Sequence, residues 1–261
     1  MPAVRIIITG AADFLLRYNP FMNMVRSYAL RECVILLASG CLTLQCQDPV
    51  PSEKQAPALT TQSLILENEF VRVLDMHYPP GFNEAEHSHG RGVTVALSDY
   101  DNESKTVPEG KINKGHTKFG EVRWAEPVTH EAHNVGTTLQ HVIRIELKGQ
   151  PSGVVKNDPY DSMVVSKATH KVVLENRYVR VVEDHLPPSG TEPKHTHPHG
   201  VVIMMSDFDS ETRTYPDISS KDGRISRNHY NKGLVRWAEP NVHDVKNVGA
   251  TELYVIRIDL K

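Results

Sequence analysis

Apolar and polar side chains alternate in several short stretches of the chain. Residues 256–260 alternate isoleucine or leucine with charged side chains, and residues 143–148 repeat that pattern. A period of two is expected for a β-strand that buries one of its faces. The apolar run Val201–Met205 is short enough for a fully buried strand. Turn-forming residues interrupt the chain too often for long helices, so the patterns predict an all-β fold of the sandwich, jelly-roll or barrel type.

These strand patterns occur twice, because the chain contains an internal repeat. Residues 66–73 return as residues 174–181, an offset of 108 (174 − 66). After a loop that is five residues longer in the second copy (113 − 108), residues 122–127 return as residues 235–240. Two tandem domains of one fold are therefore expected. The predicted segments are residues 1–62 as a signal-like N-terminal segment and tether, 63–149 as domain 1, 150–167 as a linker and 168–261 as domain 2.

Each copy also repeats a set of three histidines. A His-x-His pair stands at residues 87–89 and again at residues 195–197, and a third histidine follows each pair within the sequence His-x-x-x-Asn. In a strand, residues i and i+2 project from the same face about 6.6 Å apart, so both rings of a pair can point at one metal ion. The six candidate metal ligands are His87, His89, His130, His195, His197 and His243.

The motifs resemble those of the cupin superfamily. Its first motif is a glycine, then His-x-His, then a glutamate a few residues later, and its second is a glycine, a proline turn and His-x-x-x-Asn. Residues 81–89 and 190–197 resemble the first half of motif one, and residues 120–134 and 233–247 resemble motif two. The resemblance covers nearly all of residues 64–261. It implies a bicupin, with two tandem cupin (double-stranded β-helix, jelly-roll) barrels that each hold a metal inside the barrel mouth.

The glutamate of the first motif is missing. It would fall near Val93 or Thr94 in the first copy and near Val201 or Val202 in the second, and no carboxylate stands there. Both sites are therefore predicted to be three-histidine sites, a ligand set found in some cupin dioxygenases. Three neutral imidazoles leave the +2 charge of the ion uncompensated and three octahedral positions open. Such a centre favours a bidentate anionic ligand such as an enolate, a carboxylate or a catecholate.

The resemblance and the ligand set together suggest a dioxygenase-type oxidoreductase that binds a small oxygen-rich substrate and O₂ on Fe(II). Imidazole ligands do not select the metal, so Zn, Mn, Ni and Cu are alternatives to Fe(II). Three other hypotheses stay open: a non-catalytic cupin that binds a small acid or sugar, a metal-dependent isomerase or decarboxylase, and a cupin that has kept the fold and lost the chemistry. A fold does not fix a function, so enzymatic activity is left undecided.

Several neighbouring residues are assigned lesser roles. Asn134 and Asn247 of the second motif are expected beside the ligands or in turns rather than as ligands. His199 extends the second His-x-His pair but corresponds to an arginine in the first copy, so it is predicted to lie at the rim. His77 and His185 correspond to each other, and each faces the cavity or closes a strand.

The N-terminal segment has the layout of an export signal. A basic stretch from Met24, a short apolar core and small residues precede Cys41. Residues 38–41 resemble a bacterial lipobox, in which the cysteine is lipidated. We therefore expect an exported protein, periplasmic, secreted or lipid-anchored at Cys41, with a cytoplasmic protein as the alternative. Translation can start at Met1, Met22 or Met24.

Charge and composition narrow the partners. A net charge of −3 and a pI near 6.5, without a cluster of Lys and Arg, argue against nucleic acid. No apolar run reaches the roughly 18 residues of a membrane span. All three cysteines precede residue 47, so the folded body does not depend on disulfides. A small anionic ligand or substrate is the expected partner, and assembly into a homo-oligomer stays open.

Overall fold

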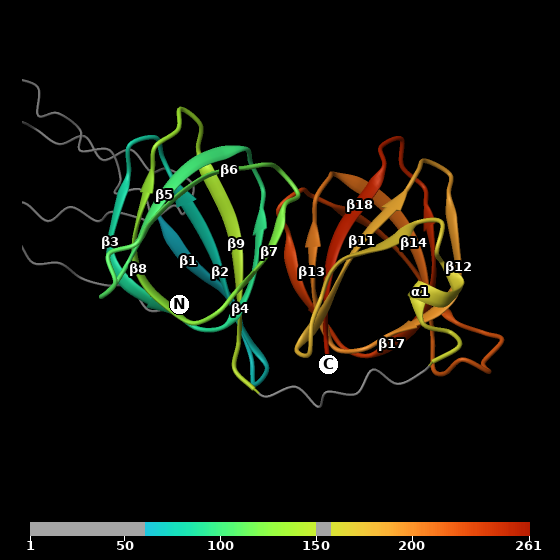
Figure 1. Ribbon diagram of the computed structural model, residues 1–261. Helices are drawn as coiled ribbons and strands as arrows, with labels where there is room; N and C mark the ends of the chain where they lie inside the picture. Colours follow the sequence, from blue (N-terminus) through green and yellow to red (C-terminus); the bar gives the residue numbers. More distant parts are fainter. Residues whose placement is uncertain (1–60, 150–157) are drawn as a thin grey trace, which may run out of the picture. The chain divides into compact units, whose positions relative to one another are not determined.

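The computed structural model describes residues 61–149 and 158–261, which fold almost entirely into β-strands (Figure 1). The predicted export signal, Cys41 and most of the tether lie outside the described residues, so export and lipidation stay predictions. In the described ranges a single helix of four residues stands beside eighteen strands. Within the same ranges, no helix has the length and apolar character that crossing a membrane requires.

The first copy of the repeat contains nine strands. They are β1 (Gln62–Glu67), β2 (Val71–Tyr78), β3 (Asn83–His89), β4 (Gly92–Ala96), β5 (Tyr100–Thr106), β6 (Ile112–Thr117), β7 (Val122–Ala125), β8 (Val128–Asn134) and β9 (Gln140–Leu147). We call this unit the first barrel.

The second copy, the second barrel, begins with a short helix and then repeats the nine strands. They are α1 (Ser162–Val165), β10 (His170–Glu175), β11 (Val179–Leu186), β12 (Thr191–His197), β13 (Gly200–Met204), β14 (Phe208–Tyr215), β15 (Arg224–Tyr230), β16 (Val235–Ala238), β17 (Asn241–Asn247) and β18 (Leu253–Leu260).

Each barrel is built from two antiparallel sheets. The first has the strand orders β1-β2-β9-β4-β7 and β3-β8-β5-β6, and the second has the matching orders β10-β11-β18-β13-β16 and β12-β17-β14-β15. The predicted all-β fold with two jelly-roll barrels is therefore confirmed. In both barrels the His-x-His strand and the strand of the third histidine are neighbours in the four-stranded sheet (Figure 1).

The five-stranded sheets bury both of their faces. On β9, Val142 packs into the core inside the first barrel, whereas Ile143 and Ile145 join a second core. That second core also contains Val181 and Ile258 of the second barrel, so the two barrels share it. The alternation along β9 predicted one apolar buried face, but Arg144 on the other face is only 5% exposed because it lines the barrel beside the histidines.

Two aromatic stacks connect the barrels at equivalent positions of the repeat. Phe70 stacks on Trp237 with ring centroids 5.2 Å apart, and Tyr178 stacks on Trp124 at the same centroid distance. His199, predicted at the rim, lies 5.0 Å from Phe70, centroid to centroid, and is part of this packing. The stacks extend the shared core along the contact between the barrels.

Candidate metal centre

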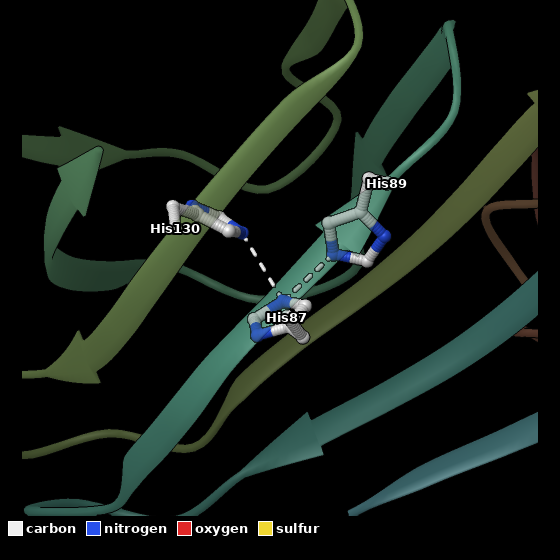
Figure 2. Close-up of side chains that lie close together, drawn as sticks. All are labelled: His87, His89 and His130. Atoms are coloured by element: carbon white, nitrogen blue, oxygen red, sulfur yellow. Dashed lines mark hydrogen bonds between the residues drawn. The ribbon is translucent and has the colours of Figure 1, made fainter. Parts of the chain in front are cut away.

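Strands β3 and β8 bring three predicted ligands of the first barrel together. His87 and His89 lie on one face of β3, and the antiparallel register places His130 of β8 directly opposite His87. The Nε2 atom of His87 lies 2.9 Å from Nε2 of His89 and 3.1 Å from Nε2 of His130. Figure 2 shows the three rings, the first trio, pointing toward one another.

The second barrel repeats this arrangement. His195 of β12 lies opposite His243 of β17, and their Nε2 atoms are 2.9 Å apart. The Nε2 atoms of His195 and His197 are 3.0 Å apart. The structure thus brings all six predicted ligands together as two trios, one in each barrel. The second trio is the more enclosed, since His195 is fully buried.

The barrel interior favours the uncharged form of His89 and His130 in the first trio and of His197 and His243 in the second. Burial, helped by the Arg144 guanidinium, lowers the pKa of His89 to about 4, and burial beside His87 lowers the pKa of His130 to about 4. In the second trio, burial holds the pKa of His197 and of His243 well below the ordinary value. A neutral imidazole is the form that binds a metal ion, so these four rings are in the state that ligation needs.

A glutamate that the motif comparison missed lies beside the first trio. The Oε2 atom of Glu84 is 3.4 Å from Nε2 of His87. In a regular strand, residues three apart face opposite sides. Here a β-bulge lies between them. Glu84 pairs with Ala132 and His87 with His130, so an interval of three residues on β3 lies opposite an interval of two on β8. The extra residue returns Glu84 to the face that carries the histidines. The spacing Glu-x-x-His occurs in both copies, which is the signal the sequence offered.

The first centre fits a divalent transition metal. Glu84 Oε2 is buried and makes no well-formed hydrogen bond among the described residues, and the buried Tyr78 hydroxyl beside this carboxylate makes none either. A buried carboxylate oxygen without a partner is costly unless a cation compensates it. Three imidazole nitrogens within 4.8 Å of one another are a donor set that such ions accept, and Oε2 of Glu84 lies beside one of them.

A second carboxylate orients one ring of the first trio. Nδ1 of His89 lies 3.0 Å from Oε1 of Glu146, which also accepts a hydrogen bond from Nε of Arg144 at 3.2 Å. A carboxylate behind a histidine fixes the ring orientation and leaves the other nitrogen for a metal. In the second barrel the shorter Asp259 takes this position and is bound by Arg257, and Nδ1 of His197 has no partner among the described residues.

The other residues named from the sequence have structural positions. Asn134 and Asn247 are buried and brace turns; Nδ2 of Asn134 donates to the carbonyl oxygens of Tyr78 and Thr138, both at 2.8 Å. His77 and His141 each place Nε2 within 2.9 Å of Oδ1 of Asp75, in a partly exposed cluster that contains no member of the first trio. The equivalent of His77, His185, stacks on Tyr254.

Comparisons with known proteins support the architecture. No model of a protein family matches the chain, and no curated protein sequence matches it. Among solved structures, AerE from Microcystis aeruginosa matches with a TM-score of 0.53 and 12% identity over 77% of this chain and 97% of that chain.

Two further structures are oxalate decarboxylases. The enzyme from Bacillus subtilis at pH 4.6 matches with a TM-score of 0.53 and 12% identity over 76% of this chain and 70% of that chain. The enzyme from Lactobacillus farciminis, in a formate complex, matches with a TM-score of 0.50 and 13% identity over 74% of this chain and 77% of that chain. Sequence identities this low show a shared fold and nothing about shared activity. The chain therefore shares the two-domain fold of these structures, which is the cupin-type fold that the motifs predicted.

Proposed function

We propose that this bicupin is a metal-dependent enzyme whose first barrel acts on a small anionic substrate, as an oxidoreductase of the dioxygenase type. The observation that carries the proposal is the buried Oε2 atom of Glu84, which makes no well-formed hydrogen bond among the described residues and lies 3.4 Å from Nε2 of His87, beside two rings that stay uncharged at neutral pH. A bound divalent ion would act as a Lewis acid that orients an oxygen-rich substrate and, as Fe(II), would supply a site for O₂.

The first trio and Glu84 are the residues that would hold the ion. Four protein donors leave fewer open positions than the three histidines alone, and one anionic donor reduces the net charge of the centre from +2 to +1. Glu146 keeps the His89 ring in place, which limits the reorganisation needed when a ligand arrives.

The neighbourhood of the first trio suits an anion that enters from solvent. The Arg144 guanidinium is buried close enough to His89 and His130 to lower their pKa values, so it supplies positive charge inside the barrel. Side-chain exposures of 21% for His87 and 15% for Glu84 leave the first centre in contact with solvent. The second trio is less open, since His195 is fully buried and His197 is buried while His243 is partly exposed. We therefore assign catalysis to the first barrel.

A metal-dependent decarboxylase is the second candidate. Carboxylate donors suit Mn(II) better than an all-imidazole set does. With Glu84 as a ligand, Mn(II) is therefore expected as well as Fe(II). One of the similar structures concerns the Mn(II) centres of Bacillus subtilis oxalate decarboxylase. Its 11% identity to this chain supports the shared fold, and the carboxylate donor is what favours this candidate.

Oxygen consumption and CO₂ release distinguish the candidates. The metal-free protein is loaded separately with Fe(II) and Mn(II) and assayed with small dicarboxylates, β-dicarbonyl compounds and catechols. Net O₂ uptake that requires Fe(II) supports the dioxygenase, and CO₂ release without net O₂ uptake supports the decarboxylase. His89→Ala should abolish either activity, whereas Ile112→Ala, at a side chain that is 55% exposed, should leave it unchanged. Ligand-dependent stabilisation without turnover of any compound would instead indicate a binding protein.

A further inference from the structure

A fourth histidine lies beside the second trio. His170, the first residue of β10, is only 7% exposed, and its ring centroid is 5.6 Å from that of His195 and 6.1 Å from that of His197. One of its ring nitrogens lies within 4.8 Å of a ring nitrogen of His195 and of one of His197. It therefore stands within reach of a metal held by the His195 and His197 pair, whereas His243 lies outside the 4.8 Å limit of this group.

The hydrogen bonds of His170 leave one nitrogen for a metal. Its Nδ1 atom lies 3.0 Å from Oγ1 of Thr169 and 3.3 Å from Oε1 of Glu192. Thr169 in turn donates its hydroxyl proton to Glu192 at 2.6 Å. With Nδ1 engaged by these two groups, Nε2 is available, and a carboxylate behind an imidazole is the arrangement that orients metal-binding histidines.

We propose that His170 is a fourth imidazole ligand of a metal in the second barrel, and that this centre is structural. The proposal rests on the second trio holding a metal and is independent of the activity proposed for the first barrel.

The first barrel lacks this ligand. Gln62 occupies the matching position (170 − 108), since Gln62 pairs with Met76 in the same register in which His170 pairs with Asp184. The two equivalent glutamates also differ. Glu84 lies beside His87 as a candidate donor, whereas Glu192 lies behind His170. The fourth donor thus changes from a carboxylate in the first barrel to an imidazole in the second.

The chain around β12 encloses the second centre. Residues 158–166 lie against this strand, and α1 stands beside it in Figure 1. The backbone N–H of Thr196 donates to the carbonyl of Tyr160 at 2.8 Å, and its hydroxyl donates to Asp158 at 2.6 Å. Thr196 separates the two histidines of the pair, so these bonds hold the ligand strand in place. An enclosed site with four imidazoles suits a retained metal better than an exchanging substrate.

The test isolates the second barrel in the full chain. In a His87→Ala/His89→Ala background, the protein is loaded with Cu(II), and the coordinated imidazoles are counted by pulsed electron paramagnetic resonance. We expect four. A count of three overturns the proposal without any change at His170, so the result does not depend on the folding of a further variant.

Affinity gives the second readout. In the same background, His170→Gln introduces the residue that stands at the matching position of the first barrel. We expect Zn(II) affinity, measured by competition with a chelator, to fall at least about tenfold. Loss of a group that only orients a ligand already costs that much, and loss of a ligand should cost no less. His185→Gln, at a side chain that is 41% exposed and stacked on Tyr254, is the matched control and should change nothing. Unchanged affinity in a folded His170→Gln protein refutes the fourth ligand alone. A background protein that binds no metal refutes both the fourth ligand and the second metal centre, and neither result bears on turnover by the first barrel.

Discussion

A single extra residue in β3 decides the composition of the first centre. Without the bulge, Glu84 and His87 would project from opposite faces of the strand, and the barrel would offer the three histidines alone. With it, a carboxylate oxygen lies 3.4 Å from an imidazole nitrogen. The donor set therefore follows from local backbone geometry as much as from the residue types.

Glu84→Gln tests that conclusion at the residue scale. The substitution preserves the shape of the side chain and removes the charge that a cation would compensate. We expect at least about a tenfold loss of Mn(II) affinity in the first barrel, measured by chelator competition, with the second barrel unaffected as an internal control. In the metal-free protein, the free energy of unfolding should stay equal or rise, because an uncompensated buried carboxylate is lost. Unchanged affinity in the first barrel would show that Glu84 is not a ligand.

At the scale of strands, the turn after β8 has a defined brace. Asn134 is 1% exposed, its Nδ2 donates to two carbonyl oxygens, and its Oδ1 accepts a hydrogen bond from the N–H of Gly136 at 3.0 Å. One of those carbonyls belongs to Tyr78 at the end of β2. The side chain thus joins the ends of two strands from different sheets, and Asn247 does the same in the second barrel.

Asn134→Ala should therefore destabilise the first barrel. Removing the amide leaves several buried backbone groups without partners, so we expect a loss of about 2–4 kcal/mol in the free energy of unfolding. Urea unfolding of the metal-free protein measures it. Asn113→Ala, at an exposed position of β6, should change the same quantity by less than about 0.5 kcal/mol. Equal values for the two variants would contradict the bracing role.

The sequence was informative where residue spacing alone carries the geometry. The repeat offset predicted two like barrels, and the i, i+2 spacing placed His87 and His89 on one face. The position of Glu84 depends on a bulge, which the Glu-x-x-His spacing does not reveal by itself. His170 precedes His195 by 25 residues (195 − 170) on a strand of the other sheet, so only the closed barrel brings the two together. Arg144 occupies a polar position of an alternating strand, yet it is buried because that face lines the barrel.

For the whole molecule, the buried histidines make stability depend on pH. The pKa of His89 and of His130 is about 4 in the folded protein and about 6.5 in an unfolded chain. Between these values only the unfolded chain binds the protons, so the stability present above pH 6.5 is lost as the pH falls. The four histidines around the second centre act in the same direction, since their pKa values are also lowered. Burial raises the pKa of Asp184, so this side chain favours the folded protein as the pH falls. It can offset at most one of the protons that the unfolded chain binds in excess.

We expect the free energy of unfolding of the metal-free protein to fall between pH 6.5 and pH 5. The slope is about 1.4 kcal/mol per pH unit for each proton that the unfolded chain binds in excess. Denaturant titrations at several pH values measure it, and a His89→Gln/His130→Gln variant should show a shallower slope. A flat profile for the unsubstituted protein would mean that these rings take up protons in the fold over the same pH range as in the unfolded chain.

The metal content of the molecule is testable with one double variant. His89→Ala with His197→Ala removes one ligand from each trio, and we expect loss of metal from both barrels with the strands intact. The protein is purified without added metal, its metal content is determined by elemental analysis, and its far-ultraviolet circular dichroism is compared with that of the unsubstituted chain. Metal retained at the original level by the double variant would refute both centres.

The core shared by the barrels determines how this protein can be dissected. Val71, Val73, Ile143 and Ile145 are completely buried, and they belong to the same cluster as Val181 and Ile258. Expressing the two repeats as separate fragments would expose the apolar face of a β-sheet on each of them to solvent. Such fragments would aggregate or pair with one another in solution. Assigning a task to either half therefore requires point changes in the intact polypeptide.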